Sequence, residues 1–509
     1  MPSNQHPTLP APGDKSFFGH PRGLATLFFT EMWERLSYYG MRALLLLYMV
    51  KEINEGGMGL DDKTGTAIYG LYTMLVYLLA LPGGWLADNL LGLRKAVFYG
   101  GFLITAGHFS LAFDTPESFF IGLLLIVLGT GLLKPNVSSL VGQLYDMNDQ
   151  ARRDAGFSIF YMGINIGGLL GPLTAGIIGE KINWHYGFAT AGVGMALGVI
   201  QYKLTEKTLG AVGALPNINP DPAMQAKKES TIRKGLWVLT GLLVLFVAAL
   251  IKGYLKIDVV LIAHTALYAL AGCAILYFSY IFIFEKLDRS QRQKIGVIAV
   301  FFTTSCIFYG GLEQQGSTLN LFAERYTDMN IFGYRLATTS MQSVPTFAAV
   351  LLAPLFAWLW VVLARRKMNP STPVKISLGM IFMALGFVVM MGASLRVVSG
   401  HFPLPTWLIA TYFIHTTGEI FLYVVGLSAV TKLSPQHLMG QLMGVWFMSL
   451  AIGNLAAGLF AGEFDRNLIE ANPYLLVTLF GKVVVWMGIA GVTLLLLAKP
   501  LRRWMGNIL

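Results

Sequence analysis

Long apolar runs dominate the chain, and short polar segments separate them. A membrane-spanning helix needs about 20 mostly apolar residues, and only helices or closed barrels satisfy their backbone polar groups in lipid. We therefore predict fourteen transmembrane helices. They are expected near residues 24–50, 66–90, 95–113, 118–145, 155–180, 185–204, 235–251, 258–284, 295–323, 332–363, 374–396, 404–431, 438–462 and 472–498.

The predicted helices form two groups of six with an extra pair between them. The segment Thr205–Ser230 is polar and rich in proline, and two spans follow it before the second group begins. Six spans plus six is the arrangement of major facilitator transporters, whose halves are related repeats. We therefore expect an all-α polytopic membrane protein of this fold. Its expected parts are an N-terminal tail (1–23), a six-helix bundle (24–204), a polar linker with two extra helices (205–290), a second six-helix bundle (291–503) and a C-terminal tail (504–509).

Composition and charge agree with a membrane protein. Only 13% of the residues are charged and the mean hydropathy is +0.60, whereas soluble domains carry about 25% charged residues. The net charge of +10 does not indicate nucleic-acid binding, because the basic residues lie in short loops beside the apolar runs. Such residues set topology, and placing the N-terminus inside puts most of the 37 Lys and Arg on the cytoplasmic side. The expected location is the inner membrane, with both termini cytoplasmic.

The first predicted span contains charges that lipid would not tolerate. Glu31, Arg35, Tyr38 and Arg42 are spaced i, i+4, i+7 and i+11, which places them on one helical face, and Glu34 lies beside them. A charge at mid-bilayer costs at least about 2.5–3.5 kcal/mol. A water-filled pathway or binding site explains the cluster; a salt-bridge ladder that only holds helices together is the alternative.

Three further charges lie near the middle of predicted spans. Lys134 precedes Pro135 in the fourth, whereas Glu313 and Glu419 are the central acids of the second half. The first half thus has a basic surplus and the second an acidic one. If the halves face one another across a cavity, that cavity complements a zwitterion such as an amino acid or short peptide. A basic surplus would also suit an anion.

Uphill transport requires a coupling ion. The sequence contains no nucleotide-binding loop and no divalent-cation motif. Buried carboxyl groups can carry protons, since burial raises the pKa of a carboxyl group and a neighbouring cation lowers it. A substrate that competes for the cation therefore links its own binding to protonation. We expect no cofactor, and the proton as coupling ion.

Two glycine-containing motifs indicate close helix contacts. GGWLADNLLGLRK joins the second and third spans, where Gly83 permits close approach and Asp88 can cap or bridge a neighbouring helix end. Gly163, Gly167 and Gly171 form a small-residue stripe on the fifth span, which is typical of helix packing.

Several motifs, in order, resemble the proton-dependent oligopeptide transporter family. The first-span signature ExxERxxYYG reads here as Glu31–Gly40, and the fifth-span signature resembles Phe160–Gly167. The seventh-span EQ pair is similar to Glu313-Gln314, and the tenth-span GE pair to Gly418-Glu419. The stretch GLSAVTKLSPQHLMGQLMGVWF also follows the family pattern, and the two extra helices are typical of bacterial members.

The resemblance implies roles for individual residues. Arg35 and Lys134 would receive a peptide carboxylate, Asn165 and Glu419 its amino group, and Arg42 would pair with the seventh span across the outer gate. The residues expected to bind substrate are Arg35, Tyr38, Tyr77, Lys134, Asn165, Glu313, Glu419 and Trp446. Those expected to couple protons or gate are Glu31, Glu34, Arg35, Arg42, Lys134, Glu313 and Asp88.

Three positions depart from the family pattern. Val344-Pro345 replaces Asn-Pro, Tyr423-Val424 replaces Ser-Pro, and Tyr309 replaces a tryptophan. They put the substrate preference in question, although not the fold.

The expected function is a monomeric proton-coupled symporter that imports di- and tripeptides. A symporter for nitrate, an amino acid, a nucleoside or a drug-like cation is the alternative. A membrane enzyme or receptor is not expected, because the chain has no HExxH pair, nucleophile elbow or soluble catalytic domain.

Overall fold

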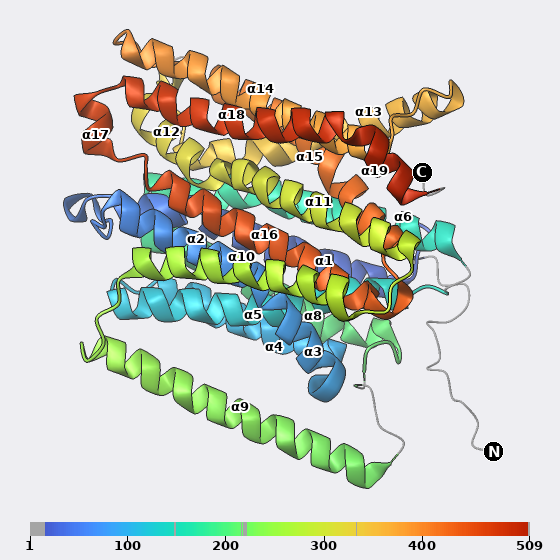
Figure 1. The fold of residues 1–509 in the computed structure, drawn as a ribbon. Coiled ribbons are helices and arrows are strands. Elements are labelled where there is room, and N and C mark those ends of the chain that lie inside the picture. Colours follow the sequence, from blue (N-terminus) through green and yellow to red (C-terminus); the bar gives the residue numbers. More distant parts are fainter. Residues whose placement is uncertain (1–15, 147–148, 215, 217–220, 332, 507–509) are drawn as a thin grey trace. The chain divides into compact units, whose positions relative to one another are not determined.

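The computed structural model describes residues 16–146, 149–214, 216, 221–331 and 333–506, without the side chains of Pro222, Tyr423 and Val424. The departure expected at Tyr423-Val424 therefore lies outside the described side chains. Apart from the hairpin β1–β2 (Asn330–Ile331 and Tyr334–Arg335), the regular structure of these residues is helical. Eleven of their helices are long and apolar enough to cross a membrane (Figure 1). The other three predicted spans correspond to α1, α4 and α8.

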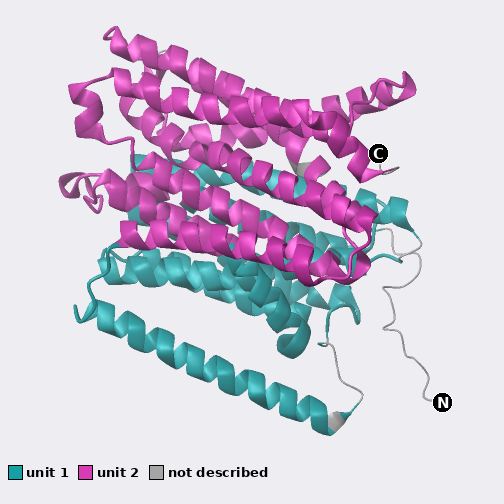
Figure 2. Ribbon diagram, in the orientation of Figure 1, with its two compact units in different colours: residues 1–41, 78–258 teal, residues 42–77, 259–509 magenta. Residues whose placement is uncertain are grey.

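The chain forms two compact units, residues 1–41 with 78–258 and residues 42–77 with 259–509 (Figure 2). The division falls within the first long helix and at the end of the second. Unit 1 contains α1 (Arg22–Val50) as far as Met41, α3 (Ala80–Leu86), η2 (Ala87–Leu91), α4 (Leu93–Leu111), α5 (Pro116–Gln143), α6 (Gln150–Gly171), η3 (Pro172–Gly176), α7 (Ile177–Lys181), α8 (Trp184–Thr205), η4 (Glu206–Leu209) and α9 (Pro222–Ile251).

Unit 2 contains the rest of α1 and most of the remaining helices. Its other elements are η1 (Ile53–Glu55), α2 (Asp62–Leu78), α10 (Val259–Phe284), α11 (Arg289–Leu312), η5 (Glu313–Gly316), α12 (Thr318–Tyr326), η6 (Thr338–Ser343), α13 (Val344–Arg365), α14 (Thr372–Val398), α15 (Thr406–Leu433), η7 (Gln436–Leu438), α16 (Met439–Ala461), α17 (Arg466–Ala471), α18 (Tyr474–Leu496) and α19 (Ala498–Met505).

One part of the linker expected over 205–230 is helical, and another part is buried in the apolar core. Leu209 and Val212 are buried in the apolar core of unit 1. Arg94, at the start of α4, donates from Nε to the Val212 carbonyl oxygen at 2.6 Å and from Nη2 to that of Gly210. Helix α9 begins at Pro222, where proline fits the first turn, so the last part of this segment is helical. In Figure 1, α9 lies apart from α3, α4 and α5.

Helix α2 packs within unit 2. Ala67 and Met74 of α2 join Ala263 of α10 and Leu455 of α16 in one buried cluster. A methyl group added at Gly458 of α16 would lie 2.5 Å from the Gly70 Cα, so glycine is needed for this close approach.

Three predicted spans contain breaks or begin late. The span expected at 66–90 is interrupted at Leu79, between α2 and α3. The span expected at 295–323 ends its α-helix at Leu312 and continues as the 3-10 turn η5. The span expected at 332–363 begins only at Val344, because the hairpin β1–β2 and η6 precede it and Pro345 suits a first turn.

An ion-pair network lies where α2 begins. Asp62 accepts hydrogen bonds from Arg325 Nη1 at 2.9 Å and Nη2 at 2.7 Å, and from the Arg466 backbone N–H at 3.0 Å. Beside it, Lys51 contacts Glu55 and Glu324, at 2.8 Å each. Burial acts to lower the pKa of Lys51, but its hydrogen bonds to Glu324 and Glu55 raise it above the ordinary value. The bond from Lys51 lowers the pKa of Glu55, so this pair is complete above the ordinary value of 4.5 and is lost as the pH falls below it.

Asp62→Asn is expected to lower the free energy of unfolding by about 3 kcal/mol, because it leaves the Arg325 guanidinium, 10% exposed, without its bidentate partner. The thermal midpoint in detergent measures this effect. Glu55→Gln is the matched control, since its side chain is 54% exposed and such pairs contribute less than about 1 kcal/mol. Equal shifts for the two variants would contradict the prediction.

Candidate functional site

Three buried charges of α1 form a compact cluster in unit 1. Glu31, Glu34 and Arg35 are 3%, 1% and 4% exposed. Arg35 Nη2 donates to Glu34 Oε1 at 2.6 Å, and Arg35 Nε donates to the other oxygen of Glu34. Glu31 Oε1 lies farther away, 3.3 Å from Arg35 Nε. The second oxygen, Glu31 Oε2, is buried without a hydrogen-bond partner among the described residues. The guanidinium is therefore held by Glu34, and Glu31 is the less satisfied carboxyl group.

The glycine stripe of α6 places this cluster. A methyl group at Gly163, Gly167 or Gly171 would lie 2.9, 2.3 or 2.5 Å from a backbone carbonyl oxygen of α1. A methyl group at Gly167 would also lie 2.8 Å from the Arg35 Cβ. The expected packing role is confirmed, because only glycine lets α6 contact the α1 backbone here.

The other predicted site residues of unit 1 lie on several elements, and Tyr38 contacts Arg35 directly. The Arg35 guanidinium carbon lies 5.0 Å from the ring centroid of Tyr38, a favourable cation–π position. Lys134, half-buried on α5, is near enough for its charge to act on Glu31. Asn165 is half-buried on α6 and donates from Nδ2 to the Tyr161 carbonyl oxygen at 3.1 Å. Asp88 is exposed in the π-helical turn η2, on a different element from these residues.

A second cluster of charges lies in unit 2. Arg42 forms an ion pair with Glu313, and its Nε donates to the Tyr69 hydroxyl at 2.7 Å. Glu313 is 7% exposed and begins η5, directly after α11 ends. A methyl group on Gly316 would lie 1.9 Å from the Tyr69 hydroxyl, so the turn closes directly over this pair. The break in the helix thus positions the carboxylate of Glu313.

The sequence did not single out Tyr69. It is 1% exposed and binds Arg42, yet its spacing within an apolar run resembles that of any core aromatic residue. Only its position in the fold identifies it as part of the cluster.

The remaining predicted residues of unit 2 differ in surroundings. Glu419 is half-buried on α15, and the charges of Glu313 and Arg42 act on it. Within the described part of unit 2, no basic side chain forms an ion pair with Glu419. Trp446 is 2% exposed, and its ring packs against Gly426. Tyr77 packs against the cluster that joins α2, α10 and α16.

Comparisons with known proteins identify the family. A profile of the POT family matches residues 94–474. The chain is 40% identical over 507 residues to "Peptide transporter YePEPT" of Yersinia enterocolitica subsp. palearctica, covering 97% of each protein. The chain belongs to the POT family. This POT chain is also 34% identical over 514 residues to a "Di-/tripeptide transporter" of Lactococcus lactis subsp. cremoris, covering 97% of this chain and 98% of that protein.

A solved structure supports the same assignment. The crystal structure of a peptide transporter in complex with sulfate matches with a TM-score of 0.87 and 40% identity, covering 97% of this chain and 98% of that one. The prediction of a proton-dependent oligopeptide transporter family member with the major facilitator fold is thus confirmed. The protein is a multi-pass membrane transporter rather than an enzyme.

Proposed function

We propose that this POT chain imports di- and tripeptides together with protons, by alternating access across the bacterial inner membrane. Both termini lie in the cytoplasm in this proposal, and the chain acts as a monomer. Relatives that match almost its whole length are named as peptide transporters. The observation that carries the proposal is a set of buried or half-buried ionisable side chains: the Glu31–Glu34–Arg35 cluster, the Arg42–Glu313 pair, and Glu419. Charged side chains are energetically costly on a surface that faces lipid.

Peptide recognition requires groups that bind both ends of a zwitterion. Arg35 and Lys134 receive the peptide carboxylate, and Asn165 and Glu419 receive its amino group. Tyr38, which packs on Arg35, and the buried Trp446 line the pocket, as does Tyr77. Glu313 takes part both in substrate binding and in gating through Arg42.

Proton coupling uses the competition for Arg35. A peptide carboxylate that binds Arg35 and Lys134 weakens their attraction for Glu31. Glu31 is desolvated and its second oxygen has no hydrogen-bond partner among the described residues, so its protonated form is then favoured. Peptide binding and proton uptake strengthen one another by the same coupling free energy. Glu34 and Glu313 rearrange with Arg35 and Arg42 as the transporter changes state.

The test is uptake into liposomes that contain only the purified protein. An inward proton gradient should accumulate labelled dialanine, and a proton ionophore should abolish the accumulation. A counterflow panel of dialanine, nitrate and an amino acid separates the alternative symporters. Exchange of nitrate or the amino acid, without exchange of dialanine, would overturn the peptide proposal.

Asp88→Asn is expected to slow dialanine exchange at least tenfold while leaving the equilibrium dissociation constant within about twofold, because Asp88 lies apart from the binding residues on η2. We attribute to it a role in closing the inner side of the transporter. Binding by calorimetry and exchange in liposomes measure the two effects. The control is the double variant Asp88→Asn/Asn89→Asp, which keeps the negative charge but moves it from position 88 to position 89. A large loss of affinity with normal turnover would contradict this role.

A further inference from the structure

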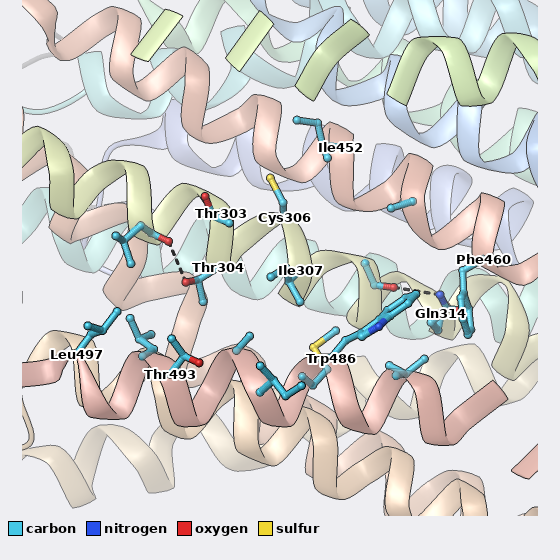
Figure 3. Close-up of a pocket in the computed structure, with 18 residues that line it drawn as sticks. Thr303, Thr304, Cys306, Ile307, Gln314, Ile452, Phe460, Trp486, Thr493 and Leu497 are labelled. Atoms are coloured by element: carbon cyan, nitrogen blue, oxygen red, sulfur yellow. Dashed lines mark hydrogen bonds between the residues drawn. The ribbon is translucent and has the colours of Figure 1, made fainter. Parts of the chain in front are cut away.

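An apolar pocket lies within unit 2, between helices α11, α16 and α18. Its volume is about 630 Å³, within the range of about 300–1,000 Å³ that is typical of ligand cavities. Figure 3 shows Cys306 and Ile307 of α11, Ile452 and Phe460 of α16, and Trp486 of α18 around it. The pocket is separate from the Arg42–Glu313 pair, although Gln314 forms part of its wall.

Three polar side chains of the wall already donate hydrogen bonds within the protein. The hydroxyls of Thr303 and Thr304 donate to the carbonyl oxygens one turn earlier in their own helix, at 3.0 and 2.9 Å. Gln314 Nε2 donates to the Gly310 carbonyl oxygen at 3.1 Å. These donors are already used and most of the other lining residues are apolar, so the wall favours an apolar occupant over several waters, each of which needs two to four polar partners.

The pocket opens toward the outside of the chain. Trp486, Ile489 and Leu497 line it and are 54%, 62% and 41% exposed. All three belong to the apolar length of α18 or to the residue that follows it. In a membrane, this opening faces hydrocarbon, and an empty groove would forfeit dispersion contacts with that hydrocarbon.

The length of the pocket suits a single acyl chain. From Val483 to Leu497, its lining residues span about 21 Å along the helix axis at 1.5 Å per residue. The lining of α11 and η5, from Val300 to Gln314, covers the same number of residues. One leaflet is about 15 Å of hydrocarbon, so a groove of this length accommodates a chain that enters at one end.

One end of the pocket carries positive charge. Lys499 follows the lining residue Leu497 by two positions, and Arg502 and Arg503 lie further along α19. All three are exposed, whereas Leu501 and Met505 of the same helix are buried. A basic amphipathic helix of this kind is typical of an interface with anionic lipid.

A contact on α11 places α19 at that end. A methyl group on Gly296 would lie 3.5 Å from the ring of Trp504, and Gly296 precedes the pocket residue Val300 by one turn. Trp504 is 41% exposed, as an aromatic residue at the headgroup level would be. The apolar groove and the basic helix are therefore continuous.

We propose that unit 2 binds one anionic glycerophospholipid, with an acyl chain in the α11–α16–α18 pocket and its phosphate group at Lys499, Arg502 and Arg503. The acyl chain fills a groove that three helices leave open, and the exposed cations select the headgroup. This assignment is independent of which solute the protein transports.

The experiment measures quenching of Trp486 by phospholipids brominated on the acyl chain, with the full-length protein in detergent. Subtracting the quenching seen in Trp486→Phe isolates this residue from the other nine tryptophans. Brominated phosphatidylglycerol should quench Trp486 at a concentration at least fivefold lower than brominated phosphatidylcholine. Native mass spectrometry should retain one phosphatidylglycerol per chain.

Two pairs of variants test the two parts of the site. Ala456→Leu fills the pocket, and Ala357→Leu adds the same bulk at an exposed position on α13. Replacing Lys499, Arg502 and Arg503 by Gln removes the headgroup site, and the same replacement of Arg365, Arg366 and Lys367 removes an equal charge at the end of α13. The first member of each pair should raise the half-quenching concentration of phosphatidylglycerol at least fivefold, and the second should change it less than twofold.

Thermal midpoints establish that each variant is folded, and the comparison of the two lipids needs no variant of the pocket lining other than Trp486→Phe and none of the headgroup site. Equal quenching by both lipids would overturn the proposal. So would a folded Ala456→Leu protein that binds phosphatidylglycerol as wild type does, or a loss of binding as large in the Arg365–Lys367 control as in the α19 variant.

Discussion

Glu419→Gln is expected to reduce uptake of peptides with a free amino group by about 100-fold, because losing a partly buried ion pair costs about 3 kcal/mol. Glu419 is half-buried, and no basic side chain in the described part of unit 2 forms an ion pair with it. Arg42, whose charge acts on Glu419, is bound to Glu313 instead. The ammonium group of a peptide can therefore bind Glu419 without displacing a basic side chain of unit 2. The measurement is proton-driven uptake of labelled dialanine in liposomes.

N-acetylated dialanine separates a binding role from a structural one. It should bind wild type poorly and lose less than about threefold further in Glu419→Gln, since the interaction is already absent. Glu463→Gln, which removes a 47%-exposed acid paired with Lys482, is the matched control and should transport normally. Equal losses for the free and acetylated peptides in Glu419→Gln would contradict the assignment.

Glu31→Gln is expected to abolish accumulation under a proton gradient while preserving exchange of peptide in counterflow. Each pH unit supplies about 1.4 kcal/mol per proton, which supports about tenfold accumulation when one proton is coupled. Glutamine cannot ionise, so position 31 stays in the neutral state that peptide binding would otherwise induce in Glu31. Its accumulation ratio should therefore fall to about 1 under the same gradient.

The geometry favours Glu31 over Glu34 as the proton acceptor. Glu34 receives two hydrogen bonds from Arg35, whereas Glu31 lies 3.3 Å from it and has one oxygen without a partner among the described residues. Protonating Glu31 therefore breaks the fewest contacts. Glu34→Gln, the control, should reduce both exchange and thermal stability, because it loosens Arg35. Full gradient-driven accumulation by Glu31→Gln, or loss of its counterflow as complete as the loss of driven uptake, would refute the role.

The sequence alone determined the class of the protein and most of its candidate site. Apolar runs long enough to cross the bilayer are expected to be helices. Lipid offers no hydrogen-bond partner to backbone N–H and C=O groups, so these groups must bond within the segment. Charges within such runs are so costly that their positions mark a site without any knowledge of packing. Glu31, Glu34, Arg35, Arg42 and Glu313 were all identified in this way, and the structure finds them buried or largely buried.

Helical periodicity could not determine which charges pair. The i, i+4 spacing suggests Glu31 as the partner of Arg35, yet the shortest contacts of Arg35 are to its sequence neighbour Glu34. The partner of Arg42 is Glu313, 271 residues away. Spacing fixes the face on which a side chain lies, whereas rotamers and neighbouring helices decide what that side chain meets.

The tertiary structure alone decided where helices break and how the chain divides. Glu313 reaches Arg42 because α11 ends at Leu312, and no proline marks this end within the apolar run. The C-terminal part of α1 and most of α2 belong to unit 2, where Gly70 packs on Gly458 and Asp62 binds Arg325. These features depend on contacts between residues hundreds of positions apart, for which a local pattern carries no signal.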